Sequence, residues 1–227
     1  MSKLKAIIFD FDGVLAESVN VKDDAFLAIF NEFGEDFARS MLSYHKTLNT
    51  DRYLTIKEAA RRLNREDESF LSSKACEFAT QVVERVTRVS EVEGALSLLQ
   101  YLADNRLLAF ISSGAPQDEL REIVKARHID HFFNGVFGIP DSKVDHIKYI
   151  LSRYSLHNQD CIFIGDTMLD YRSAHAMDIP FIARSESCSF PAGGRVVPDM
   201  NVLLDMCKSG IDPAEILEEI QHKERRL

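Results

Sequence analysis

The chain of 227 residues is longer than an average domain of about 150 residues, so it has room for a core and an insertion. Its net charge of −9 argues against a nucleic-acid-binding protein, which needs a basic face. No apolar run approaches the roughly 18–20 residues of a membrane helix. The four cysteines show no metal spacing, and the N-terminus leads straight into a strand without a cleavable signal. We therefore expect a reduced cytoplasmic protein that binds neither nucleic acid nor membrane, as a monomer or small homo-oligomer.

The first predicted strand covers residues 4–9, a continuous apolar run typical of a strand buried on both faces. It stops at Asp10-Phe11-Asp12-Gly13. Asp10 and Asp12 are two residues apart and point to the same side of an extended chain. Two buried carboxylates repel each other unless a cation offsets them, and oxygen ligands with room for water suit Mg²⁺. The alternative is a simple turn, because aspartate and glycine are common in turns.

Helical periodicity follows at residues 21–33, 56–63 and 70–86, with no convincing strand before about residue 89. Roughly seventy residues are too many for an ordinary crossover. We interpret residues 17–88 as an inserted helical cap domain. Residues 1–16 and 89–227 then form the core domain.

Strands and helices alternate in the rest of the chain. The predicted strands are 107–111, 135–138, 161–164 and 180–183, and the predicted helices are 93–105, 117–126, 144–154 and 171–177. Pro116 is expected in a first helical turn, residues 185–198 in a loop, and a last helix begins at Asp212 as N-cap. This order predicts an α/β fold with a doubly wound parallel sheet and right-handed crossovers.

Ligands bind such sheets at the carboxyl ends of the strands, where the unusual polar residues of this chain fall. Asp10 could attack phosphorus and form an aspartyl-phosphate, with Asp12 as general acid and base. Asp166 would add a carboxylate for the metal. Asp170, four residues later, would face the same way as a ligand or a supporting residue, although alone it is an ordinary helix residue.

The strand-to-helix turn after residue 111 offers an anion site made by the Ser112 hydroxyl and by Ser113 and Gly114 at a helix N-terminus. Lys143 would supply positive charge to the phosphoryl group and to the nucleophile. Two alternatives stay open: Ser112 could be a helix N-cap, and Lys143 could be a surface lysine.

The chain resembles the haloacid dehalogenase-like hydrolase superfamily, with a subfamily I helical cap. The motifs stand in family order as Asp10-Phe11-Asp12-Gly13-Val14, Ser112, Lys143 and Gly165-Asp166-Thr167-Met168-Leu169-Asp170. The resemblance implies Asp10 as nucleophile, Asp12 as acid and base, and Mg²⁺ held by Asp10, the Asp12 backbone carbonyl and Asp166, with Asp170 in support. The chain departs from many relatives at Val144, where they carry proline.

The cap's most polar stretch, residues 44–53, resembles the substrate-specificity region of capped phosphatases and phosphoglucomutase-like relatives. We expect Arg52, and with it His45, Lys46 and Asn49, to contact substrate. The alternative for this stretch is a solvated loop between helices.

The sequence predicts a Mg²⁺-dependent phosphatase acting on a small phosphorylated metabolite. Three other functions are alternatives. A phosphomutase of the β-phosphoglucomutase type fits the same motifs. A signalling receiver fits less well, because receivers are about half this length and have no cap. A non-catalytic binding protein conflicts with the intact motifs.

Overall fold

A computed structural model of the protein describes residues 4–48, 52–187, 189–191 and 194–216. The chain divides into two compact units, one of Met1–Glu17 with Val89–Leu227 and one of Ser18–Arg88. We call them the α/β unit and the helical unit. Within the described ranges, no helix has both the length and the apolar character to cross a bilayer.

The α/β unit is built on a sheet in which every neighbouring pair of strands is parallel. Its described strands are β1 (Ala6–Phe9), β2 (Leu108–Pro116), β3 (Gly135–Ile139), β4 (Cys161–Gly165), β5 (Phe181–Arg184) and β6 (Arg195–Val197). Their order across the sheet is β3-β2-β1-β4-β5-β6. Each residue of β1 is fully buried, as a continuous apolar run at the centre of a parallel sheet requires.

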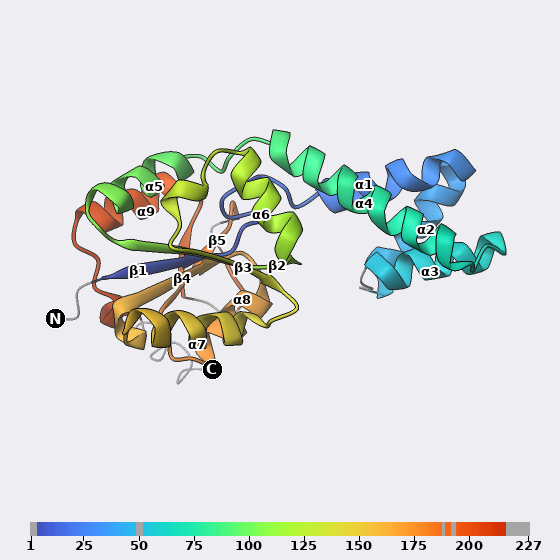
Figure 1. Cartoon of the computed structure of the whole chain (residues 1–227). Helices are drawn as coiled ribbons and strands as arrows, with labels where there is room; N and C mark the ends of the chain where they lie inside the picture. The colour runs from blue at the N-terminus through green and yellow to red at the C-terminus, as the bar shows by residue number, and fades with distance from the viewer. Residues whose placement is uncertain (1–3, 49–51, 188, 192–193, 217–227) are drawn as a thin grey trace. The chain divides into compact units, whose positions relative to one another are not determined.

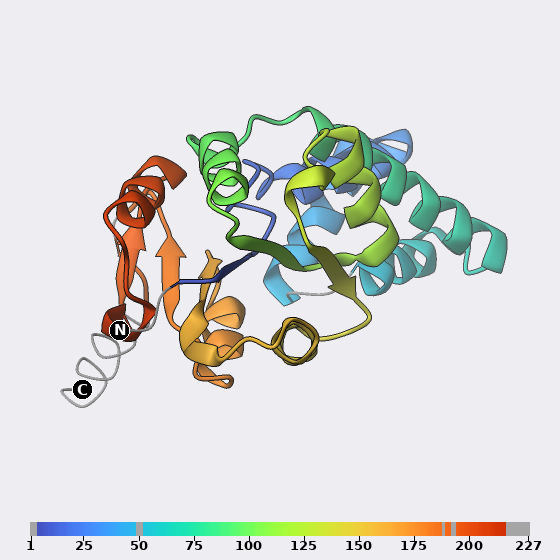
Figure 2. The ribbon, with the colours of Figure 1, turned by 60° about the vertical axis from the view of Figure 1, so that its left-hand side comes forward.

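Helices cover both faces of this sheet (Figures 1 and 2). On one face lie α5 (Ala95–Asp104), α6 (Gln117–Ala126) and α9 (Met200–Lys208), and on the other lie α7 (Lys143–Tyr154) and α8 (Met168–His175). Short 3₁₀ helices occur at η2 (Asp130–Phe132) and η3 (Asn158–Asp160). The chain changes face where it returns from β3 to β4, as right-handed crossovers demand. The predicted doubly wound α/β fold is confirmed.

The register of the central strands aligns the end of β1 with residues of both neighbouring strands. Phe9 pairs with Ile111 of β2 and with Ile164 of β4. The next residues, Asp10, Ser112 and Gly165, therefore lie side by side at the carboxyl edge of the sheet.

The helical unit contains α1 (Val21–Phe30), the 3₁₀ helix η1 (Asn31–Phe33), α2 (Glu35–Leu48), α3 (Arg52–Leu63) and α4 (Glu68–Arg88). Its core is aromatic: Phe26 and Phe78 are fully buried, with ring centroids 4.4 Å apart. The sequence analysis placed no helix at α2. Residues 44–48 end α2 and Arg52 begins α3, so the solvated-loop interpretation of 44–53 is wrong for these residues.

Two expected boundaries in the α/β unit are also wrong. β2 does not end at residue 111 but continues to Pro116, because its backbone pairs with β3 on both sides of an irregularity between Ser112 and Pro116. Pro116 is the N-cap of α6 and lies before its first turn. Pairing with a neighbouring strand satisfies the backbone N–H and C=O groups whatever the polarity of the side chains. The polar residues from Ser112 onward were therefore a poor indication of where β2 ends.

The segment 185–198, expected as a loop, contains the edge strand β6, which pairs with β5. α9, for which the sequence analysis made no prediction, begins after Asp199, whose side chain accepts hydrogen bonds from the N–H groups of Asn201 and Val202. The predicted N-cap at Asp212 is confirmed, since its carboxylate accepts from the Ala214 N–H at 2.9 Å and residues 213–216 are helical.

Candidate active site

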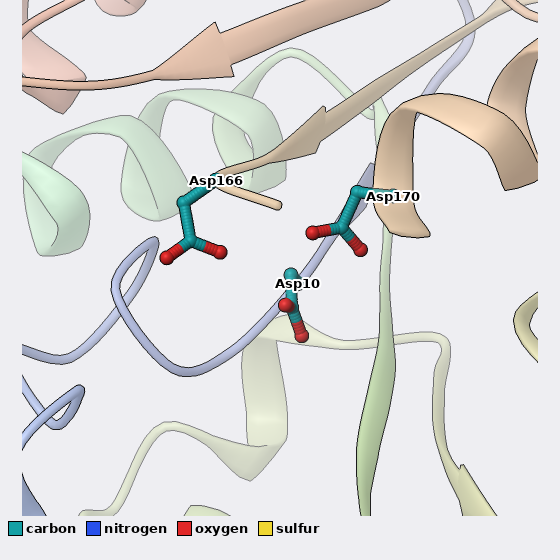
Figure 3. A group of neighbouring side chains, drawn as sticks. All are labelled: Asp10, Asp166 and Asp170. Carbon is teal, nitrogen blue, oxygen red and sulfur yellow. The ribbon is translucent and has the colours of Figure 1, made fainter. Parts of the chain in front are cut away.

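Three carboxylates converge at the carboxyl edge of the sheet (Figure 3). Asp10 follows β1, Asp166 follows β4, and Asp170 lies in the first turn of α8. One carboxylate oxygen from each lies within 4.8 Å of the other two. Two unit charges at that separation repel by roughly 3 kcal/mol at an effective dielectric constant of about 20. The cluster therefore requires positive charge or protons.

Asp170 is held in the cluster by the way α8 starts. Thr167 is the N-cap, and its hydroxyl accepts from the Asp170 N–H while the Asp170 carboxylate accepts from the Thr167 N–H at 3.0 Å. This capping box satisfies backbone donors that the helix leaves free. Gly165 allows the approach, because a Cβ at that position would lie 2.3 Å from the Asp170 Cβ.

Lys143 is the first residue of α7 and is buried, not a surface lysine. Its Nζ lies 3.0 Å from Asp10 Oδ2 and also pairs with Asp170 Oδ1. Burial alone would lower the pKa of Lys143, but the Asp10 and Asp170 carboxylates outweigh it and raise that pKa. Lys143 is therefore a fixed cation that pairs with two of the three acids.

One lysine leaves the cluster too negative. Burial, with Asp170 in second place, raises the pKa of Asp10 to about 8, although Lys143 opposes the shift. Burial and Asp170 likewise raise the pKa of Asp166 to about 6. The Asp166 Oδ1 atom is buried and has no hydrogen-bond partner among the described residues. An oxygen-only donor set with one orphaned, buried carboxylate oxygen fits a hard divalent cation such as Mg²⁺.

The Asp12 carboxylate is not part of this group of oxygens. It lies close enough that its charge contributes to raising the pKa values of Asp10 and Asp166. Its predicted metal contact is through the backbone carbonyl and stays a prediction, as does its acid–base role.

Ser112 is fully buried inside β2, and its Oγ lies 2.9 Å from His146 Nδ1. It is not a helix N-cap, because α6 begins only at Gln117. For the same reason, the predicted helix N-terminus beside Ser112, Ser113 and Gly114 is wrong. Their predicted roles in substrate binding remain predictions.

A family model described as haloacid dehalogenase-like hydrolase matches residues 7–184. The chain belongs to this family. No curated protein matches the sequence.

Solved structures with the same fold cover nearly all of this hydrolase. A predicted phosphoglycolate phosphatase from Haemophilus somnus 129pt superposes with a TM-score of 0.70 at 16% identity, covering 91% of this chain and 99% of the other. CbbY from Rhodobacter sphaeroides, in complex with xylulose-1,5-bisphosphate, gives 0.65 at 15% identity, with coverages of 86% and 94%. β-Phosphoglucomutase from Clostridium difficile gives 0.64 at 17% identity, with coverages of 88% and 93%. At these identities the similarity establishes a shared fold.

The candidate substrate residues of the helical unit have partners within that unit. His45 Nδ1 lies 3.2 Å from Thr55 Oγ1, and Lys46 pairs with Asp23. The Arg52 guanidinium lies 4.8 Å from the centroid of the Phe78 ring. Asn49 lies outside the described residues.

The sequence analysis assigned no role to three residues that shape this site in the hydrolase: His146, Arg184 and Thr167, the last of which it named only within a motif. Arg184 ends β5 and binds the loop after β1, donating to the Gly13 carbonyl at 3.2 Å and pairing with Glu17. Two of them left a detectable signal. The spacing Thr167-x-x-Asp170 is that of a capping box, and Arg184 is a cation at the carboxyl end of a parallel strand.

The raised pKa values predict how cation binding depends on pH. Some carboxyl groups have a higher pKa in the folded state than their usual value near 4. Such a group lowers the stability of the fold as the pH rises from its usual pKa to its folded-state pKa. Mg²⁺ binds the ionised form, so thermal unfolding by circular dichroism should show Mg²⁺ raising the Tm by several degrees at pH 8 and by much less at pH 5. An equal increment at both values would contradict the proposed cation site.

Asp166→Asn is the matched variant for that experiment. It removes one charge from the cluster, so it should unfold at a higher temperature than the parent at pH 8 without Mg²⁺ and lose most of the Mg²⁺ increment. Asp205→Asn, at a side chain that is 80% exposed, should behave as the parent.

A second prediction concerns Gly165. Gly165→Ala should destabilise the protein by about 1–3 kcal/mol, because the added methyl overlaps Asp170 and pushes α8 away from β4. It should also weaken the Mg²⁺ increment. Gly114→Ala is the control, since a Cβ there meets no atom of the described residues within 4 Å. Urea unfolding curves with equal midpoints for the two variants would show that the close approach at Gly165 is not required.

Proposed function

We propose that this hydrolase is a Mg²⁺-dependent phosphatase that cleaves a small phosphorylated metabolite through an aspartyl-phosphate on Asp10. The observation that carries the proposal is the cluster of Asp10, Asp166 and Asp170, two of them buried and Asp166 half-buried, with Lys143 against it. A carboxylate at the end of the central strand, neutralised from one side by a lysine, suits attack on a phosphoryl group that is itself anionic.

In the first step, an ionised Asp10 oxygen attacks phosphorus, and the bond from phosphorus to the ester oxygen breaks. Asp12 gives its proton to the departing alkoxide, so the alcohol leaves neutral. In the second step, Asp12 takes a proton from water, and the water oxygen attacks the same phosphorus. Inorganic phosphate departs and the Asp10 carboxylate is restored, so protons and charges balance over the cycle.

Lys143 and Ser112 would hold the transferred group. Lys143 keeps a positive charge next to Asp10 through both steps, which offsets repulsion between the carboxylate and the phosphoryl oxygens. Ser112 lies level with Asp10 on the neighbouring strand, where its hydroxyl can bind a phosphoryl oxygen.

Asp10, Asp166 and Asp170, with the Asp12 carbonyl expected from the family resemblance, are the residues that would hold Mg²⁺. Bound there, the ion would neutralise the carboxylates and the phosphoryl oxygens together. It would also bring the pKa of Asp10 down from about 8, so that the nucleophile is ionised at neutral pH.

We further propose that the helical unit is a cap that selects the substrate, with Arg52, His45, Lys46 and Asn49 as its predicted contacts. A cytoplasmic location and a monomeric or small homo-oligomeric state belong to the same proposal. The alternative function is a phosphomutase acting on a sugar phosphate. It is supported by the shared fold with β-phosphoglucomutase, but the same fold is shared with a predicted phosphoglycolate phosphatase.

Substitution of the nucleophile tests the reaction. With Mg²⁺ and a panel of several dozen phosphorylated metabolites, the parent should release inorganic phosphate from at least one. Asp10→Asn should lower that rate by at least about a thousandfold, because an amide oxygen is a poor nucleophile. Asp205→Asn should retain the full rate. An Asp10→Asn variant with parental turnover would rule out the aspartyl-phosphate.

The products distinguish hydrolysis from phosphoryl transfer within a sugar. ³¹P NMR of a reaction with a hexose 1-phosphate should show either no turnover or free phosphate. Accumulation of an isomeric sugar phosphate without free phosphate would replace the phosphatase with the phosphomutase.

A further inference from the structure

His146 lies one helical turn after Lys143 on α7 and is only 3% exposed. Its Nδ1 is 2.9 Å from Ser112 Oγ, and its Nε2 is 3.2 Å from the Gly138 carbonyl oxygen. One imidazole therefore connects α7, the interior of β2 and the end of β3. Neither the proposed reaction nor the sequence motifs use this residue.

The direction of both hydrogen bonds follows from the partners. A carbonyl oxygen only accepts, so Nε2 must carry the hydrogen and donate it to Gly138. Burial lowers the pKa of His146, which favours the neutral ring. The Nδ1 atom of a neutral ring with hydrogen on Nε2 is an acceptor, so the Ser112 hydroxyl donates to it.

The hydrogen bonds of His146 fix the position of the Ser112 Oγ atom. A serine side chain otherwise has three staggered rotamers of similar energy, and only one of them suits a given neighbour. Here Lys143 and His146 are three residues apart on one helix face, so the turn that contacts Asp10 also contacts Ser112.

We propose that His146 is a positioning residue of this hydrolase, which fixes the Ser112 hydroxyl beside Asp10 by accepting its hydrogen at Nδ1. The inference rests on the proposed function, in which Ser112 binds the transferred phosphoryl group. On binding, the oxygen is already in place and keeps its contact with Nδ1, while the hydroxyl hydrogen turns about the C–O bond into a three-centre hydrogen bond shared by Nδ1 and a phosphoryl oxygen.

The effect should fall on KM. Ser112 would hold phosphoryl oxygens in the substrate and in the transition state alike, and such uniform binding changes KM more than kcat. With the best phosphate ester from the panel, His146→Leu should raise KM about three- to tenfold and change kcat by less than about twofold.

A rescue variant and a double-mutant cycle separate this role from general packing. The Oδ1 of His146→Asn can stand near the position of Nδ1 and accept from Ser112, so KM should return to within about twofold of the parent. In a Ser112→Ala background, His146→Leu should raise KM no further. Equal KM values for His146→Asn and His146→Leu, or additive effects with Ser112→Ala, would overturn the proposal.

A measurement that does not depend on activity completes the test. The ¹⁵N chemical shifts of the His146 ring should report hydrogen on Nε2 and a hydrogen-bonded, unprotonated Nδ1 that changes in Ser112→Ala. Hydrogen on Nδ1 would overturn the proposal. If the parent hydrolyses no phosphate ester, the proposed function fails, and the ring spectrum alone then decides the hydrogen bond.

Discussion

The α/β unit is organised around a repulsion that its own fold imposes. The ends of β1 and β4 and the first turn of α8 bring one carboxylate oxygen each of Asp10, Asp166 and Asp170 within 4.8 Å of the others, with Asp10 and Asp170 buried and Asp166 half-buried. Burial, with the Asp170 carboxylate in second place, raises the pKa of Asp10 to about 8, and Lys143 offsets only part of that shift. A site of this kind is destabilising to the empty protein and becomes favourable when a cation and an anionic group enter together.

The fold tolerates that repulsion because the surrounding backbone is heavily constrained. β1 is buried at the centre of the sheet and paired on both sides. The Asp10 N–H donates to the Ile164 carbonyl at 2.8 Å, so the backbone after β1 is tied to β4. Arg184 holds the following loop through the Gly13 carbonyl. Separating the acids would break several such bonds, each with a net value of about 1 kcal/mol, besides exposing apolar strands.

Sequence reasoning found what depends on local pattern and missed what depends on partners distant in the chain. The apolar run before Asp10 and the alternation of strands and helices predicted the fold, and polar residues after strands indicated Asp10, Asp166 and Lys143. β6 was missed because its three residues are a strand only through pairing with β5. His146 was missed for a similar reason. A histidine in the first turn of a helix has no recognisable function in the sequence, and its contacts with β2 and β3 are made only in the folded chain.

The departure from the family pattern at Val144 has a local explanation in the start of α7. Ser142 is the N-cap, and its hydroxyl accepts from the Asp145 N–H at 3.1 Å, so the helix start is specified without proline. Lys143 is then fixed as the first helical residue and His146 as the fourth, which sets both on the side facing the sheet. The cap at Ser142 thus determines the register of the two side chains that contact Asp10 and Ser112. A shift of α7 by one residue would rotate both side chains by about 100° about the helix axis and separate the lysine from the acids. The position at which this helix begins is therefore as necessary to the site as the aspartates are.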